Sequence, residues 1–267
     1  MRAVALFVFV LTLRAQDPAA GVNFYSLEKE RALGAQIAAD YRKRAEPLVS
    51  PELLALVEAL GRELIPAESR FTYTFELVAA DDGVLHEPVA LPGGFVFVPA
   101  ALIRAARSRA EIAGMLAHAI AHVEARHATR QATRTQLMNT ATVPLIFIGN
   151  WNGAMQQGAA RAIPLSMVKF ARSVELDADR VGAAMMAGAG YAPARLADYL
   201  ERVAPPDPDP PDAGSPYPPK AGRVAALRAL PAPAVDAPAP SDDIARWREL
   251  LDRVLPVQTR TPPHLAR

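Results

Sequence analysis

The chain of 267 residues contains no cysteine. Disulfides, thiolate metal sites and cysteine nucleophiles are therefore excluded, and any metal ion must be held by histidine or carboxylate side chains. Net charge is also nearly absent, because 29 lysines and arginines stand against 28 aspartates and glutamates. Such a chain has no strong general attraction to phosphate or to anionic lipid, so we expect no nucleic-acid partner.

The sequence also lacks an apolar run of the roughly 20 residues that a membrane-spanning helix needs. Residues 3–13 form a shorter apolar run, broken only by Thr12, that follows Arg2 and ends just before Ala15. This pattern is typical of a signal peptide. We therefore expect cleavage after residues 1–15 and a mature chain, without a transmembrane segment, in the periplasm or secreted. A buried N-terminal helix is the alternative interpretation.

What is present is an ordinary globular composition, 51% hydrophobic and 21% charged. A period of 3.6 in the apolar residues predicts helices, and a period of two predicts strands. The helices are expected at residues 25–44, 51–64, 108–140, 167–187 and 196–203, and the strands at 71–77, 84–91 and 95–98, with a turn at 81–83. The predicted fold is α+β and mainly helical, with a small antiparallel sheet.

Proline divides the C-terminal part of the chain. Residues 204–220 contain eight prolines and residues 231–240 contain four, so both segments are expected to be extended connectors around a short helix at 223–230. A last amphipathic helix at 242–255 could dock on the main domain. We expect one principal domain at residues 16–230, followed at 231–267 by a connector and the C-terminal helix.

Three of the five histidines lie within ten residues of the predicted helix at 108–140. His118 and His122 are one turn apart on one face, a spacing that lets two imidazoles bind one zinc ion. His127 lies about 140° further around a continuous helix and is not expected to share that ion. Because a packed or surface histidine pair has the same spacing, a second feature is needed.

That second feature is an acidic pair, Glu175 and Asp179, one turn apart on a later helix. One carboxylate could serve as a third metal ligand, and the other could accept the remaining N–H of a ligand imidazole. The alternative interpretation is an acidic helical turn that balances Arg172 and Arg180.

Three blocks of sequence resemble the M48 zinc metallopeptidases. They are LPGGFVFV at residues 91–98, AEIAGMLAHAIAHVEARH at 110–127 and RSVELDADRVG at 172–182. The resemblance runs from about residue 24 to 230 and is closest to single-domain periplasmic members that handle outer-membrane proteins.

The resemblance implies a zincin-like metallopeptidase domain with one zinc ion per chain. It implies His118, His122 and Glu175 as the zinc ligands, with Asp179 behind them. It also implies that residues 95–98 form the edge strand along which a substrate peptide would lie.

One residue departs from the family pattern at the point where the chemistry occurs. The family has glutamate after the first ligand histidine, as the general base that takes a proton from the attacking water, and here Ala119 replaces it. A positioned general base is worth about 10²–10⁴-fold in rate. Glu111 and Glu124 lie too far along or around the predicted helix to replace it. Efficient hydrolysis by the usual mechanism is therefore not expected.

Two further departures lie outside this helix. Glu87 and Pro88 stand where the family usually has Asn-Ala, and a proline removes a backbone donor from a candidate substrate strand. Tyr217 stands where close relatives carry a histidine near the metal cleft. We interpret Tyr217 as packed among the prolines rather than as a hydrogen-bond donor in the cleft.

These observations lead to two functional hypotheses. The first is an M48-type metalloendopeptidase-like protein of the bacterial envelope that acts on envelope or misfolded outer-membrane proteins, with hydrolysis weakened or lost. The second is a non-catalytic pseudopeptidase that binds polypeptides in the cleft as a chaperone or adaptor, which Ala119 favours. A structural domain without metal is a third possibility that metal analysis would distinguish.

Overall fold

The computed structural model describes residues 22–79, 86–147, 153–207, 215, 217–231 and 241–255. The expected signal peptide at 1–15 and the expected turn at 81–83 lie outside these residues. Across the described part of the chain, every helix is too short or too polar to cross a membrane.

The two N-terminal helices form as the periodicity predicts. The serine before each helix accepts a backbone N–H of its first turn, which satisfies a donor that has no partner inside the helix. The second helix buries its apolar face in the main core, and the first lies against the sheet, where Ala38 packs with Phe95 and Phe97. The helices are α1 (Leu27–Arg42) and α2 (Pro51–Leu64).

The sheet has three strands in the order β1-β3-β2, and it is mixed. Strand β3 (Phe95–Pro99) is parallel to β1 (Thr74–Val78) and antiparallel to β2 (Val89–Leu91). The prediction of an antiparallel sheet is therefore wrong for one of its two pairings. Gly93 and Gly94, both at positive φ, turn β2 tightly back onto β3. In the sheet, β3 lies between β1 and β2.

This strand order also corrects the expected substrate strand. Residues 95–98 belong to the central strand, which is paired on both sides and buried along its whole length. The strands at the two edges are β1 and β2 (Val89–Leu91), and each pairs within the sheet with β3 alone. Which strands become neighbours in a sheet depends on contacts between residues far apart in the sequence. The period of the apolar residues within each strand does not indicate it.

Helix α4 (Arg109–Glu124) runs through the centre of the molecule, and residues 110–121 are all buried. Its predicted capping serine, Ser108, accepts the N–H of Glu111 at 3.2 Å. A short helix, α3 (Ala100–Ala105), precedes it and was not predicted.

The single helix expected at 108–140 is wrong, because the chain breaks between α4 and α5 (His127–Phe147). Arg126 adopts a left-handed conformation, with φ of 57°. Such a conformation is unfavourable for a residue with a side chain and is retained only where the surroundings fix it. Here Arg126 donates hydrogen bonds of 2.5 Å to Glu30 and to the Tyr25 carbonyl.

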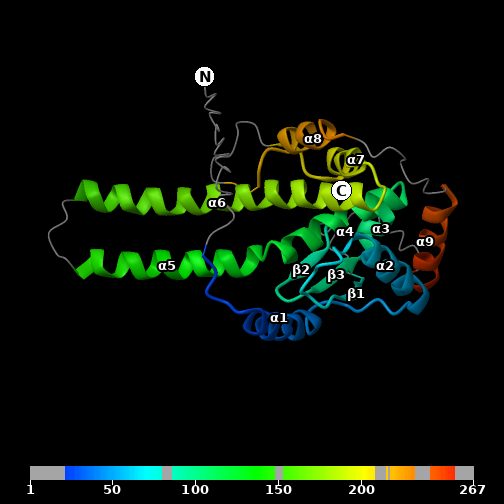
Figure 1. Cartoon of the computed structure of the whole chain (residues 1–267), viewed down its shortest axis with the longest axis horizontal. Coiled ribbons are helices and arrows are strands. Elements are labelled where there is room, and N and C mark those ends of the chain that lie inside the picture. Colours follow the sequence, from blue (N-terminus) through cyan, green and yellow to red (C-terminus); the bar gives the residue numbers. More distant parts are fainter. Residues whose placement is uncertain are drawn as a thin grey trace, which may run out of the picture.

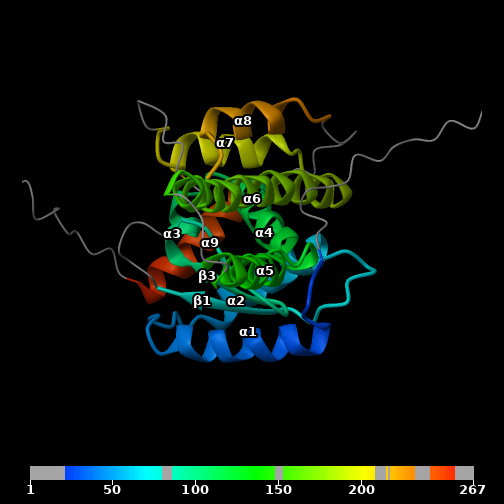
Figure 2. The same ribbon diagram turned by 90° about the vertical axis from the view of Figure 1, so that its left-hand side faces the viewer.

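The remaining helices complete a layered, mainly helical α+β fold, which confirms the predicted class. Helix α6 (Gly153–Gly188) extends further toward the N-terminus than the predicted helix and runs beside α5 away from the body of the molecule (Figure 1). Figure 2 shows α7 and α8 on one side of α6, with α4, the sheet and α1 following on the other. The last helices are α7 (Ala194–Val203), α8 (Lys220–Arg228) and α9 (Ser241–Val254).

Candidate metal centre

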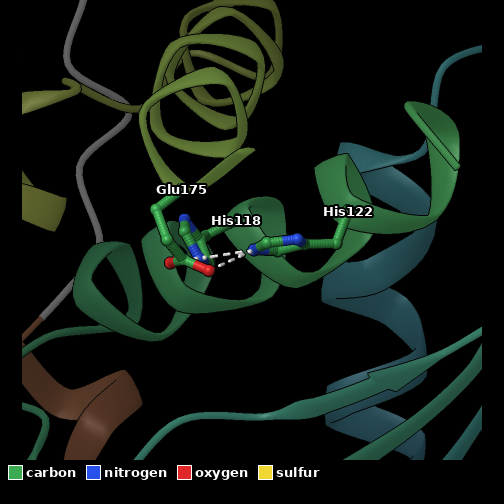
Figure 3. Close-up of side chains that lie close together, drawn as sticks. All are labelled: His118, His122 and Glu175. Carbon is green, nitrogen blue, oxygen red and sulfur yellow. Dashed lines mark hydrogen bonds and ion pairs between the residues drawn. The ribbon is translucent and has the colours of Figure 1, made fainter. Parts of the chain in front are cut away.

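The three expected metal ligands converge where α6 crosses α4. His118 and His122 project from α4, and Glu175 reaches them from α6 (Figure 3). A glycine on α6 allows this close approach, because a Cβ added at Gly182 would lie 2.9 Å from the backbone nitrogen of His118. The two helices are therefore in backbone contact at the level of the first ligand.

The distances within this trio are close to those of a single metal site. The Nε2 atoms of His118 and His122 lie 3.0 Å apart, and the Glu175 carboxylate oxygens lie 3.6 Å and 3.7 Å from them. Ligands about 2.0–2.2 Å from a tetrahedral zinc ion lie roughly 3.3–3.6 Å from one another. The residues present therefore fit zinc, with two imidazoles and one carboxylate leaving a fourth position open.

Asp179 lies behind His118, the position that the family resemblance implies for it. Its Oδ1 is 2.9 Å from Nδ1 of His118, so it can accept the N–H of an imidazole whose Nε2 faces the metal position. Asp179 is itself held by Arg223, which donates to its two oxygens at 2.7 and 2.8 Å. Both members of this ion pair are at least 94% buried.

Arg223 is a site residue that the sequence analysis missed. It lies on α8 after the proline-rich segment, far in sequence from both metal-ligand blocks. A signal was present, because Arg223 shares a helix face with the buried Leu227 and is therefore a charged residue on an apolar face.

The charges at the centre strongly shift the pKa values of the metal-free chain. Burial disfavours the charged form of His118, but hydrogen bonds to Asp179 and Glu175 outweigh it and raise its pKa to about 9. Burial and the charge of His118 lower the pKa of His122 to about 3. Burial opposes ionisation of Glu175, yet its contacts with His118 lower its pKa to about 2. Burial also opposes ionisation of Asp179, but its hydrogen bonds with Arg223 and His118 lower its pKa to about 2.

Among the described residues, the group that could share one ion is His118, His122 and Glu175, without His127. The structure nevertheless places its ring against His122, with the two Nδ1 atoms 3.1 Å apart. Its Nε2 lies 3.2 Å from a carboxylate oxygen of Asp177. The sequence analysis missed these contacts because it assumed a helix without the break at Arg126.

The trio forms one wall of a pocket of about 270 Å³. Ala119 lines this pocket beside the ligands, so the position at which the family carries its general base faces the cleft. Residues of the edge strand β2 and the two residues just before it, Glu87 and Pro88, also line the pocket. Glu87 forms no hydrogen bond or ion pair with any other residue that the structure describes.

Tyr217 also lines the pocket and is 59% exposed, so the interpretation that it is packed among prolines is wrong. Burial and the nearby charge of Glu175 raise its pKa. At neutral pH its phenol is therefore protonated and can donate a hydrogen bond into the cleft.

The two glutamates of α4 are used elsewhere, as expected. Glu111 pairs with Arg202, and Glu124 accepts hydrogen bonds from the hydroxyls of Tyr73 and Ser69. Neither glutamate lines the pocket, so neither replaces the missing base.

Comparison with known proteins agrees with this geometry. Beta-barrel assembly-enhancing proteases of Yersinia pestis and Escherichia coli K12 are 24% and 23% identical to the chain over 191 and 190 residues, which is 67% of this chain and 38% of each relative. A putative beta-barrel assembly-enhancing protease of Vibrio cholerae is 27% identical over 169 residues, 60% of this chain and 34% of the relative. The chain thus spans less than two fifths of the length of these relatives. The sequence profile of peptidase family M48 matches residues 56–231, which include all three candidate ligands, and the chain therefore belongs to peptidase family M48.

Proposed function

We propose that this chain binds one zinc ion through His118, His122 and Glu175 and holds polypeptides in the adjoining cleft, with peptide hydrolysis weakened or lost. The observation that carries the proposal is the ligand trio, whose distances of 3.0 to 3.7 Å suit one tetrahedral ion. The Asp179 carboxylate behind His118 supports the same assignment, since ligand imidazoles usually donate their other N–H to such a group.

The cleft offers most of what peptide hydrolysis requires. When bound, zinc would polarise a peptide carbonyl as a Lewis acid and make water a better nucleophile. The edge strand β2 presents backbone groups along one side of the pocket, where an extended peptide could pair with it. The Tyr217 hydroxyl can donate a hydrogen bond to a peptide carbonyl or to the oxyanion that develops from it.

What the cleft lacks is a proton acceptor at Ala119. A methyl group cannot take a proton from water or deliver one to the leaving amine, which removes about 10²–10⁴-fold in rate. His127 does not replace it, because both of its ring nitrogens are already in contact with His122 and Asp177. Glu87 is the remaining carboxylate on the pocket wall without an ion-pair partner among the described residues. Hydrolysis should therefore be slow, while binding of metal and peptide is retained.

The site of action is also part of the proposal. The apolar run at residues 3–13 is too short to span a bilayer and precedes a possible cleavage point, which supports export to the periplasm. The relatives are named for enhancing the assembly of β-barrels, which supports outer-membrane proteins as substrates or clients. Recovery of mature protein that begins near Gln16 from a periplasmic extract would test the location.

The absence of a general base at Ala119 also favours a second candidate function. A pseudopeptidase that keeps the ligands, Asp179 and the β2 edge but lacks the base would capture polypeptides without cleaving them. Such a protein would act as a chaperone or adaptor. The two functions differ in turnover and not in binding, so they are separated by measuring both on one sample.

The deciding experiment is zinc stoichiometry measured beside casein hydrolysis. We expect about one zinc per chain in the wild type, none in His122→Ala, and strongly reduced content in Glu175→Ala. The zinc-deficient variants should also melt at lower temperature, because metal binding stabilises the folded state. Unchanged zinc content in both variants would refute the site. Zinc at full occupancy with no casein cleavage would favour the pseudopeptidase.

A further inference from the structure

We propose that His127 is a positioning residue of the metal centre, which accepts the Nδ1–H of His122 and donates its own Nε2–H to Asp177. This arrangement fixes the second ligand in the tautomer and orientation that present its Nε2 to the metal. The inference rests on the proposed zinc site and adds to it a support that neither the spacing nor the family resemblance indicated.

The argument begins with the protons of the imidazole rings. If Nε2 of His122 is to bind a metal, its lone pair must be free, so the proton of the neutral ring lies on Nδ1. That atom is 3.1 Å from Nδ1 of His127, which must then be the acceptor. The proton of His127 consequently lies on Nε2, 3.2 Å from the Asp177 carboxylate, which can only accept. One assignment thus satisfies every ring nitrogen without conflict.

The two ligand histidines are then supported in equivalent ways. His118 reaches a buried carboxylate directly, with 2.9 Å between Nδ1 and Asp179. His122 reaches one through an intervening imidazole, and that carboxylate, Asp177, is also held by Arg180 at 2.6 Å. Both series of contacts end on carboxylates of α6, the helix that provides Glu175. Outer partners of this kind fix ring orientation and raise ligand basicity.

The break between α4 and α5 is what makes this contact possible. On a continuous helix His127 would point about 140° away from His122. The left-handed residue Arg126 turns α5 so that the His127 ring returns to His122, with ring centroids 5.0 Å apart. Arg126 is in turn held by the buried Glu30 of α1, so the N-terminal helix is connected to the second metal ligand.

A simpler interpretation is that His127 fills space, since its ring is 2% exposed. A purely structural role would make the stability of the metal-free chain depend on His127 but would leave metal affinity unaffected. The positioning role predicts instead that a change at His127 lowers metal affinity more than it lowers the stability of the metal-free chain. The two roles can therefore be distinguished by measuring the metal-free and metal-loaded states separately.

The test uses the full chain with zinc or Co²⁺ and a chromophoric chelator as competitor. His127→Leu should weaken zinc binding by about 10–100-fold and change the visible absorption of the bound Co²⁺. Asp177→Asn should weaken it in the same direction but less. His127→Asn should recover part of the affinity, because its amide oxygen can occupy the position of Nδ1 and accept the proton of His122. Thr133→Val is the matched control, because it changes a buried polar residue of α5 that lies outside the contacts among His122, His127 and Asp177. This variant should bind zinc as the wild type does.

The outcomes separate this inference from the proposed function. Wild-type zinc affinity and an unchanged Co²⁺ spectrum in both His127→Leu and Asp177→Asn would overturn the positioning role while leaving the zinc site intact. Equal losses in His127→Leu, His127→Asn and Thr133→Val would overturn it in favour of general loosening of α5. A wild type that binds neither metal would instead refute the proposed function. If His127→Leu fails to fold, His127→Asn and Asp177→Asn still decide the question.

Discussion

Arg223 holds Asp179 through two hydrogen bonds of 2.7 and 2.8 Å in a region from which water is almost excluded. Asp179 in turn faces His118, so a residue on α8 stabilises the environment of a metal ligand on α4. This relationship joins the segment after the proline-rich connector to helix α4, which carries two of the candidate metal ligands. It gives the charged side chain on the buried face of this nine-residue helix an ion-pair partner.

The first prediction concerns the stability that this ion pair provides. Arg223→Met removes one of the two cations beside the buried Asp179 carboxylate and leaves only protonated His118, and breaking a buried pair costs up to about 3–5 kcal/mol. Arg228→Met is the matched control on the same helix, since Arg228 forms exposed ion pairs that contribute little to stability. Urea unfolding of the metal-free proteins measures both free energies. Equal losses in the two variants would contradict the role assigned to Arg223.

The second prediction concerns pH. In the metal-free chain the pKa of His118 is raised to about 9, so its contacts contribute stability that is fully present below pH 6.5 and lost as pH rises through 9. Glu175 stays ionised over this range, because its pKa is lowered to about 2. Zinc requires neutral His118, so protons compete with the metal less at high pH. Both effects should widen the zinc-induced increase in melting temperature between pH 6.5 and 9.

Differential scanning fluorimetry with excess zinc or with EDTA would measure this widening. The apparent zinc affinity should rise by about tenfold per pH unit in the same window. Asp179→Asn removes the main partner of protonated His118 and should flatten the dependence. A zinc-induced shift that is constant from pH 6.5 to 9 would show that His118 does not carry a proton in the metal-free chain.

The third prediction concerns the C-terminal helix α9, which packs against α2 and α3 as its amphipathic pattern predicted. Trp247 on α9 is only 1% exposed, and truncating such a side chain costs about 3–5 kcal/mol. Trp247→Ala should therefore destabilise the whole domain in thermal unfolding, whereas Arg246→Ala on the exposed face should change little. Two separate unfolding transitions in the wild type would contradict the docking of α9 on the main core.

Some of the site could be predicted from sequence because its information is local. The turn-by-turn spacing of His118 and His122, and of Glu175 and Asp179, is fixed by the helix repeat. Any helix at these positions places each pair on one face. The resemblance then joined the two pairs, which no local pattern could do. Helix positions such as residues 51–64 were equally accessible, since a capping serine and a 3.6-residue period define them.

The features that were missed depend on tertiary contacts. The left-handed turn at Arg126 exists because Glu30, 96 residues away in sequence, binds its side chain. The position of β3 between β1 and β2 likewise depends on pairing between strands that are distant in the sequence. Arg223 reaches Asp179 only after the chain has passed through a proline-rich segment. In each case the local sequence permits several outcomes, and a distant residue selects one of them.

The last prediction concerns activity and follows from the position of Ala119. Ala119 lines the same cleft as His118 and His122 and is 1% exposed, so we expect a longer side chain at this position to extend into the cleft. Ala119→Glu should therefore raise peptide hydrolysis by about 10²-fold or more, the contribution expected of a positioned general base. Zinc content should stay the same. Ala119→Gln is the matched control, because it has nearly the same shape but cannot accept the proton, and it should remain as slow as the wild type.

Casein or a quenched fluorescent peptide, assayed at equal zinc occupancy, would separate the possible explanations. A gain in the Glu variant alone would show that the metal, the β2 edge and Tyr217 are still competent and that one missing carboxylate limits the rate. A wild type as fast as the Glu variant would mean that another group moves the proton. Glu87→Gln should then abolish the activity if that group is the Glu87 carboxylate, which lines the pocket. A Glu variant that holds zinc but stays inert would place the defect in peptide docking, where Pro88 precedes the edge strand, and would favour capture of polypeptides over their hydrolysis.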